Sequence, residues 1–194
     1  NLQDSLIHDG LWDPYNNVHM GTCAERLVTE RGYTRDQQDN YALESYRKAL
    51  DAIDSGLMKE EISPVTISTK NGEVVVSKDE EPTKFIPEKI AKLRPPFAKN
   101  GTITAANASS ISDGAAAIVL SSLETAKKFN INPVARIIAH CSFAHKPINF
   151  TTAPIQAIRK VLDACSTDIN DIDLFEINEA FACVVMAAIE ELNI

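Results

Sequence analysis

The sequence has few cysteines and histidines, and neither set is arranged like a metal centre or a disulfide framework. The four cysteines form no CxxC pair and stand among apolar neighbours, and the four histidines are scattered along the chain. Isolated cysteines of this kind are typical of buried thiols in a reducing compartment. We therefore expect no disulfides and no metal site. The cysteines are Cys23, Cys141, Cys165 and Cys183.

Long apolar runs and an excess of positive charge are also lacking. The longest apolar run, 180–189, is shorter than the ~20 residues that a membrane-spanning helix needs. The formal net charge of −8 argues against nonspecific binding to nucleic acid. We expect neither a membrane nor a nucleic acid as a partner. One stretch, 84–99, is basic, and it is either a solvated helix face or a binding site for a phosphorylated ligand.

The composition is that of a folded protein. The 194 residues are 44% hydrophobic and 24% charged, with little low complexity. A chain of this length can bury a sizeable core in one or two domains.

Local signals in the first half predict helices and one hairpin. Thr34 and Gln37 form a capping box that opens a long helix, which ends at Gly56. Asn71-Gly72 is a strong hairpin signal between two β-prone runs. The expected elements are helices at 23–31, 35–55 and 87–93, and strands at 62–69 and 73–77.

The second half alternates between strand and helix patterns. Such alternation indicates a layered α/β sheet. We place a domain boundary near Ile111 and a second break at 129–133. The expected strands are 115–121, 134–142 and 173–177, and the expected helices are 123–129, 153–164 and a last one after Glu179.

The last of these helices is apolar almost all the way round, which predicts that it is buried. The polar pair Asn178-Glu179 directly precedes this helix, so the turn that carries the pair is attached to a rigid, packed element. Asn178 can cap the helix through its side chain. Alternatively, its amide can turn outward and donate to a carbonyl or a water, as in a binding or catalytic site.

Three motifs in this order resemble those of the thiolases, enzymes that make or cleave 3-ketoacyl-CoA. EINEAFA at 176–182 resembles the family's NEAF signature, and 101–117 (GTITAANASSISDGAAA) is similar to a second family segment. HMG at 19–21 lies upstream of both. The chain resembles roughly the middle half of a thiolase subunit.

The resemblance implies an α/β fold, with part of a layered αβαβα core and an α+β loop domain. Residues 1–111 would form the CoA-binding loop domain, which is incomplete here. Residues 112–128 would end the N-terminal core domain, and 129–194 would form the first half of the C-terminal core domain.

The resemblance also implies an acyltransferase that condenses two acetyl-CoA to acetoacetyl-CoA and CoA, or runs the reverse thiolysis. The reaction needs an activated thiolate, a base and donors for the negatively charged oxygens. The family's nucleophilic cysteine, GHP histidine and CxGGG cysteine are absent from these 194 residues, so the polypeptide alone is expected to be inactive. Asn178 would fix the water that stabilises the enolate oxygen. Cys183 is near a helix start but has apolar neighbours, and we interpret it as a core residue.

By resemblance, one set of residues contacts the pantetheine, adenine or phosphates of CoA, and another lines the pocket beside the reacting thioester. Core packing is an alternative role for the pocket residues, and Glu179 is interpreted as a carboxylate favoured at a helix start. The CoA contacts are Leu11, His19, Met20, Lys84, Phe97, Ala105, Ala106, Ser109 and Ile111, and the pocket residues are Ala180 and Phe181.

Substrate and compartment follow less directly from the resemblance. His19-Met20 resembles the acetoacetyl-CoA type of thiolase, and Phe150 would shape the acyl pocket. Pro82 replaces the tyrosine of potassium-activated members, so no cofactor is expected beyond the CoA thioesters used as substrates. A homo-oligomer, dimer or tetramer, is expected, in the cytoplasm or the mitochondria. Alternatives are a 3-ketoacyl-CoA thiolase of β-oxidation and a non-catalytic protein that binds acyl-CoA or lipid.

Overall fold

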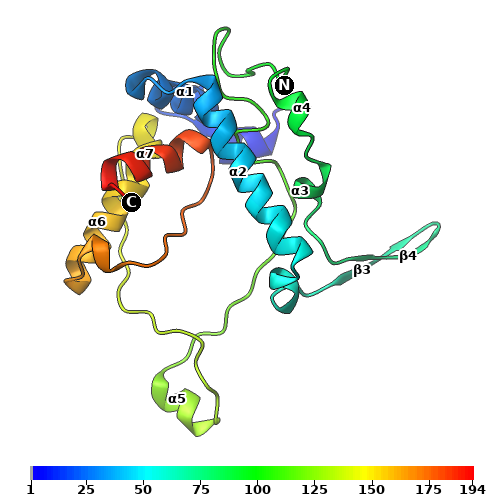
Figure 1. Ribbon diagram of the computed structural model, residues 1–194, viewed down its shortest axis with the longest axis vertical. Coiled ribbons are helices and arrows are strands. Elements are labelled where there is room, and N and C mark those ends of the chain that lie inside the picture. The colour runs from blue at the N-terminus through cyan, green and yellow to red at the C-terminus, as the bar shows by residue number, and fades with distance from the viewer. Residues whose placement is uncertain (1) are drawn as a thin grey trace.

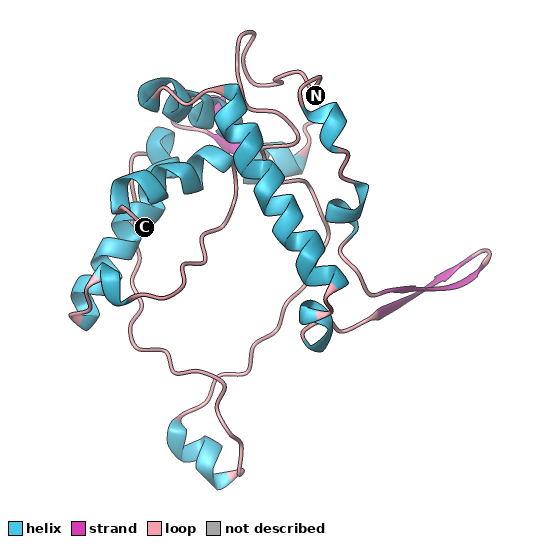
Figure 2. Ribbon diagram, in the orientation of Figure 1, coloured by secondary structure: helices cyan, strands magenta, loops and turns pink. Residues whose placement is uncertain are grey.

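Helices make up most of the regular structure, and strands are confined to two short antiparallel pairs (Figures 1 and 2). The computed structural model describes residues 2–194. The α-helices are α1 Met20–Arg31, α2 Arg35–Asp54, α3 Glu80–Lys84, α4 Pro87–Ile90, α5 Leu123–Lys128, α6 Ala153–Cys165 and α7 Ala182–Leu192. The strands are β1 Trp12–Asp13, β2 Val18–His19, β3 Val65–Thr69 and β4 Gly72–Val76. Short 3-10 or π-helical turns are η1 Leu6–Gly10, η2 Leu57–Glu60, η3 Pro147–Thr152 and η4 Ile169–Asp171.

Helix α2 begins after its predicted cap residue, whereas α1 begins at Met20, before the predicted start at Cys23. The Thr34 side chain accepts from the Gln37 backbone N–H and the Gln37 side chain accepts from the Thr34 backbone N–H, which confirms the predicted capping box. Gly32 ends α1 at φ +70°, a left-handed conformation that costs glycine little. The capping signals therefore fix the sharp turn between these two helices.

The hydrophobic core gathers around α7, as its apolar sequence predicts. Helix α7 contacts α1, α2, α6 and η3, and seven of its eleven residues are buried. Near its C-terminus, Arg31 and Arg159 both pair with Glu191, and the Tyr33 hydroxyl donates to Glu190. The core cluster comprises Ala24, Leu27, Val28, Ile103, Ile155, Phe181, Cys183, Val184, Ala187, Ala188 and Leu192.

The hairpin of β3 and β4 is confirmed and stands away from the other elements (Figure 1). Its register pairs Val65 with Val76 and Thr69 with Gly72, and Gly72 adopts φ +114° at the predicted turn. β1 and β2 form the second pair, with Trp12 opposite His19. This second pair brings His19 to the N-terminus of α1.

The three strands predicted at 115–121, 134–142 and 173–177 are not formed as hydrogen-bonded strands. These segments run as open, extended paths, the first two flanking α5 (Figure 1). A strand is stable only when neighbouring strands accept and donate its backbone hydrogen bonds. Residues 2–194 supply no such neighbours, and Val119 and Val134 are consequently fully exposed.

The predicted start of the last helix, just after Glu179, is also wrong. Helix α7 begins at Ala182, and Phe181 occupies the N-cap position without a side-chain cap bond. Asn178 therefore does not cap this helix, and Glu179 does not lie in its first turn. Both side chains remain available for other contacts.

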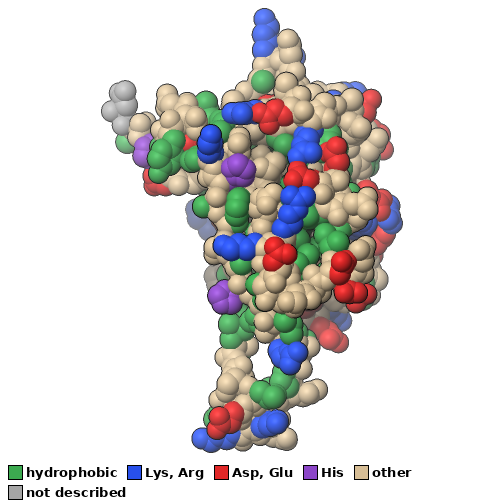
Figure 3. All heavy atoms as spheres, turned by 90° about the vertical axis from the view of Figure 1, so that its left-hand side faces the viewer, with side chains coloured by type: hydrophobic (Ala, Val, Ile, Leu, Met, Phe, Trp, Pro, Cys, Tyr) green, Lys and Arg blue, Asp and Glu red, His purple; other side chains and the backbone are tan. Residues whose placement is uncertain are grey.

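Basic and acidic side chains are interspersed on the face that Figure 3 shows. Within residues 2–194, no helix combines the length and apolar character that crossing a membrane requires. The same residues contain no group of His, Cys, Asp and Glu placed to hold a metal ion.

Candidate functional site

A buried carboxylate holds the loop that follows Gly101. Glu25 is 8% exposed, and its carboxylate accepts from the backbone N–H groups of Thr102 and Ile103 at 2.9 Å each. A Cβ at Gly101 would lie 2.2 Å from Glu25 Oε1, so only glycine allows this close approach. Two backbone donors to one carboxylate fix the start of the loop to α1.

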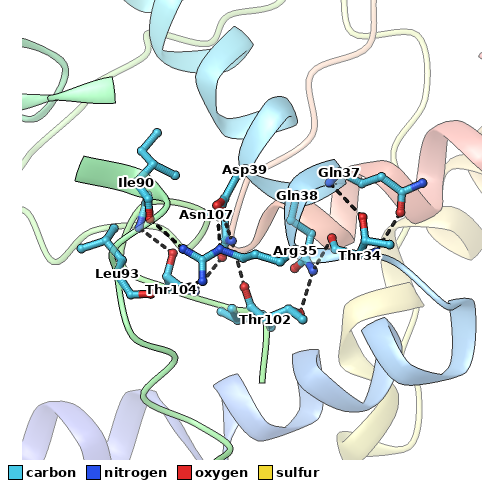
Figure 4. A network of polar contacts seen from close by, with 12 residues as sticks. Thr34, Arg35, Gln37, Gln38, Asp39, Ile90, Leu93, Thr102, Thr104 and Asn107 are labelled. Atoms are coloured by element: carbon cyan, nitrogen blue, oxygen red, sulfur yellow. Dashed lines mark hydrogen bonds and ion pairs between the residues drawn. The ribbon is translucent and has the colours of Figure 1, made fainter. Parts of the chain in front are cut away.

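A second buried network fixes the other side of this loop to α2 (Figure 4). Asn107 Nδ2 donates to Asp39 Oδ1 at 2.8 Å, while its Oδ1 accepts from the Thr104 backbone N–H at 2.8 Å. Asp39 also pairs with Arg35 at 2.6 Å, and Arg35 donates to the Ile90 carbonyl. The loop 102–107 is therefore held rigidly by side chains from two helices, as a binding loop requires.

The segment that precedes α7 is fastened to the same loop. The Ser109 N–H donates to the Ala180 carbonyl at 3.0 Å, and the Ala182 N–H donates to the Asn107 carbonyl at 2.9 Å. Ala108 and Phe181 form an antiparallel bridge between these bonds. Two of the three sequence motifs thus meet backbone to backbone, although about 70 residues separate them along the chain.

The HMG motif reaches the same place through aromatic contacts. The rings of His19 and Phe97 are stacked with centroids 4.8 Å apart, and Phe97 meets Phe181 edge to face at 6.3 Å. A Cβ at Gly21 would lie 2.4 Å from the Phe97 ring. The glycine of this motif is therefore required because the Phe97 ring packs directly on the first turn of α1.

His19 presents a hydrogen-bond donor beside this stack. Its Nδ1 accepts from the Gly21 backbone N–H at 2.9 Å, which places the proton of the neutral ring on Nε2. Burial lowers the pKa of His19, so the neutral form is favoured at neutral pH. The Nε2–H can then donate to a carbonyl or phosphate oxygen of a ligand.

A hollow of about 200 Å³ lies between α2 and the loop. Its lining includes Tyr41, Ser45, Ala106, Ser109, Ser110 and Glu179. The Glu179 carboxylate accepts from the Tyr41 hydroxyl at 2.7 Å and from the Ser45 hydroxyl at 2.6 Å. Glu179 therefore contacts α2, and its prediction as a helix-start carboxylate is wrong.

Several of the predicted site residues lie together. His19, Phe97 and Phe181 form the stack described above. Ala106 is buried in the loop, and Ser109 and Ala180 are joined by their backbones. The Met20 N–H donates to the Leu11 carbonyl at 2.9 Å, and Phe150 packs against the core cluster together with Phe97 and Ala180. Asn178 lies two residues before Ala180 on the same segment, and it is exposed.

Three other predicted site residues make no described contact with this group. Lys84 pairs with Glu80 at 2.5 Å on the short helix α3 and is largely exposed. Ile111 is 77% exposed, and Ala105 is also exposed in the loop. Their contacts with a ligand stay predictions.

The sequence reasoning did not identify the residues that hold the loop, Glu25, Asp39 and Asn107. The contacts that join the helices to the loop, from Glu25 to Thr102 and from Asp39 to Asn107, are distant in the sequence, so no local pattern predicted them. One signal was present: Glu25 is a carboxylate between Cys23, Ala24 and Leu27, on the face that α1 buries. A charge on a buried face is retained only where it is paired or hydrogen-bonded.

The cysteines of this chain are free thiols. Cys23 and Cys183 are buried, and burial raises the pKa of both thiols, that of Cys183 to about 12. A thiol with so high a pKa is a poor nucleophile. Cys183 packs in the core cluster, as predicted.

Models of two related families match the chain in sequence. Residues 1–124 match "Thiolase, N-terminal domain", and residues 131–194 match "Thiolase, C-terminal domain". The acetyl-CoA acetyltransferase of Yarrowia lipolytica is 48% identical over 193 residues, which cover 100% of this chain and 49% of that protein. The mitochondrial acetyl-CoA acetyltransferase of Mus musculus is 47% identical, over 100% of this chain and 46% of that protein. The chain spans about half the length of the curated relatives it matches.

The backbone of this chain superposes on solved structures over its whole length. A thiolase from Ascaris suum in complex with coenzyme A superposes with a TM-score of 0.93 at 44% identity, over 100% of this chain and 50% of the other. Human mitochondrial 3-ketoacyl-CoA thiolase superposes with a TM-score of 0.94 at 35% identity, over 100% of this chain and 49% of the other.

Proposed function

Because the chain belongs to the thiolase family, we propose that it forms part of an enzyme that condenses two acetyl-CoA to acetoacetyl-CoA and CoA, and catalyses the reverse thiolysis. The observation that carries this proposal is the 48% identity, over the whole chain, with a protein named acetyl-CoA acetyltransferase. The site supports it, because the three motifs of the resemblance converge around one rigid loop.

The proposed role of Asn178 is to stabilise the negatively charged oxygen of the attacking enolate through a fixed water. A donor placed where charge develops typically lowers the barrier by about 3 kcal/mol. The rigid mount supports this role, because Ser109 and Ala182 hold the adjoining backbone to the loop. The acyl-cysteine intermediate would form on a nucleophile outside these 194 residues. The base that abstracts the proton from the α-carbon would also lie outside them.

The proposed CoA site lies along the loop and the aromatic stack. His19 Nε2–H would donate to the ligand, and the Ser109 hydroxyl would bind the pantetheine arm. The small residues at 105–106 would let the ligand approach the backbone closely. Lys84 would supply a charge for a phosphate and would have to release Glu80 to do so. A thiolase from Ascaris suum in complex with coenzyme A supports this class of ligand.

The fold does not distinguish acyl length, because a 3-ketoacyl-CoA thiolase superposes as well as the other structures do. Sequence identity favours the acetoacetyl-CoA type, at 48% against 35%. Phe150 supports a short acyl group, because this bulky ring packs against the core cluster to which the pocket residue Phe181 belongs.

We also propose that the enzyme is a homo-oligomer, dimer or tetramer, that acts in the mitochondria or the cytoplasm. A mitochondrial relative from mouse supports the first compartment.

The test is to express the complete reading frame that contains this chain and to assay it. We expect CoA-dependent cleavage of acetoacetyl-CoA, with a kcat/KM at least tenfold above that for a 3-ketoacyl-CoA of eight or more carbons. The opposite preference would assign the protein to the β-oxidation type. CoA binding without turnover would support the non-catalytic alternative.

A further inference from the structure

The Glu179 side chain joins the segment before α7 to helix α2. Its two carboxylate oxygens accept separately from Tyr41 and Ser45, which stand one turn apart on the same face of α2. Among residues 2–194 no cation pairs with Glu179, so two neutral hydroxyls hold the carboxylate. A carboxylate with one donor on each oxygen has a defined orientation.

The backbone hydrogen bonds that join this segment to the loop lie on the C-terminal side of Glu179. On the C-terminal side, the Ala180 carbonyl and the Ala182 N–H are bound to the loop. On the N-terminal side, the nearest backbone bond is a tight turn from the Ala180 N–H to the Asn178 carbonyl. Within the described chain, the Asn178 side chain has no hydrogen-bond partner. Asn178 therefore lies between Ile177, which packs against the core cluster, and Glu179, whose bonds to α2 are the nearest polar contacts of the segment.

We propose that Glu179 is a positioning residue, which together with the hydroxyls of Tyr41 and Ser45 sets the direction in which Asn178 presents its amide. The inference rests on the proposed function, in which that amide holds the water of the oxyanion site. Burial and the bond to Glu179 raise the pKa of Tyr41, so its hydroxyl keeps its proton and stays a donor throughout the neutral range.

Removing the two hydroxyls tests this role without changing a charge. Tyr41→Phe and Ser45→Ala each delete one donor, and in the complete protein we expect the double variant to lower kcat about 10- to 100-fold, since a misplacement of about 1 Å has such an effect. KM for acetoacetyl-CoA should change less than about threefold. Tyr15→Phe is the matched control, because it removes a phenolic hydroxyl from a residue that is 83% exposed and lies outside the hollow, and it should leave kcat unchanged.

A double-mutant cycle separates positioning from general stability. In an Asn178→Ala background, the loss of the two hydroxyls should lower kcat no further, because the amide that they position is already absent. Equal losses of kcat in both backgrounds would show that Glu179 acts independently of Asn178 and would overturn the proposal. An unchanged kcat in the Tyr41→Phe/Ser45→Ala variant would also overturn it.

Crystal structures of the wild type and of the Tyr41→Phe/Ser45→Ala variant give a readout that needs no turnover. We expect the Asn178 amide to be displaced while the Ser109–Ala180 bond remains. An unmoved amide overturns the positioning role, even in an active enzyme. If the wild-type protein fails to cleave acetoacetyl-CoA, the proposed function fails, and the crystal structures still decide whether Glu179 orients Asn178.

Discussion

The side-chain amide of Asn178 is exposed, while the backbone next to it is fixed, and the proposed role of this residue depends on both properties. Its neighbours Ala180 and Phe181 are bound to the loop 102–109 through backbone bonds and a β-bridge. An exposed polar side chain contributes little to folding, whereas a donor with a fixed origin can act on a ligand without reorganisation. These two properties are the basis of the catalytic role that we propose for Asn178.

Replacing Asn178 by alanine in the complete protein should reduce kcat by about 100-fold, since the proposed oxyanion donor is lost. KM for acetoacetyl-CoA should stay within about twofold, because the proposed CoA contacts are other residues. Steady-state thiolysis kinetics measure both constants, and the melting temperature serves as the control for folding. A rise in KM that matches the fall in kcat would indicate a ground-state binding role instead.

Cys183 should resist alkylation in the native protein. Burial raises its pKa to about 12, so at pH 8 only about one thiol in ten thousand is ionised, and the side chain is inaccessible. Mass spectrometry after brief treatment with iodoacetamide should find Cys141 and Cys165, which are partly exposed, modified first. Unfolding in urea should equalise the rates. Native labelling of Cys183 as fast as that of Cys141 would contradict the assignment to the core.

The raised pKa also has a consequence for stability. The unfolded thiol ionises near its ordinary value of about 9, whereas the folded thiol does not. The contribution of Cys183 to stability is therefore complete below pH 9 and is lost as the pH rises from about 9 to 12.

Among the residues, the motifs and the resemblance identified several that lie together and missed most of those that support them. His19 and Phe181 belong to motifs, and Phe97, which the resemblance supplied, stacks on His19 and meets Phe181 edge to face. Glu25 and Asp39 were missed because each contacts the loop across more than 60 residues of sequence. Such contacts form only when the helices pack against the loop, so local sequence patterns do not predict them.

At the scale of elements, the loop 102–107 depends on the close approach of Gly101 to Glu25. Gly101→Ala would place a Cβ against the carboxylate and break its bonds to Thr102 and Ile103. We expect a loss of about 1–3 kcal/mol in the free energy of unfolding, the usual result of overpacking combined with unpaired buried groups. Urea denaturation of the complete protein measures this loss.

Gly10→Ala is the matched control for this prediction, because a Cβ at Gly10 meets no atom within 4 Å. It should change the free energy of unfolding by less than about 0.5 kcal/mol. If the two variants are equally stable, the contact between Glu25 and the loop does not determine the loop's stability.

Elements with local signals were predicted well, and elements that need distant partners were not. The capping box of α2, the Asn71-Gly72 turn and the apolar character of α7 each act within a few residues. The strands at 115–121 and 134–142 have the right composition but lack neighbours, so their backbones remain unpaired. The start of α7 was misjudged because Asn178 and Glu179 look like cap residues, yet the backbone bonds of Ala180 and Ala182 to the loop keep the preceding segment extended until Ala182.

At the scale of the whole molecule, the α/β fold class is confirmed by the agreement with solved thiolases. TM-scores of 0.93 and 0.94 over the whole chain mean that its path is that of a thiolase, extended segments included. The open segments around α5 therefore follow the course of sheet strands. Their apolar side chains, such as Ile118 and Val119, are exposed in the isolated chain.

This exposure predicts how the 194-residue polypeptide behaves on its own. Unpaired strand edges with apolar side chains favour association between copies. Sedimentation at several concentrations should show species larger than a monomer, and lysine at Val119 and Ile137, both largely exposed, should reduce association. The polypeptide should not cleave acetoacetyl-CoA, because its sequence lacks the family's nucleophile and base motifs. A monodisperse monomer that the lysines leave unchanged would contradict the first prediction, and CoA-dependent thiolysis by the polypeptide alone would contradict the second.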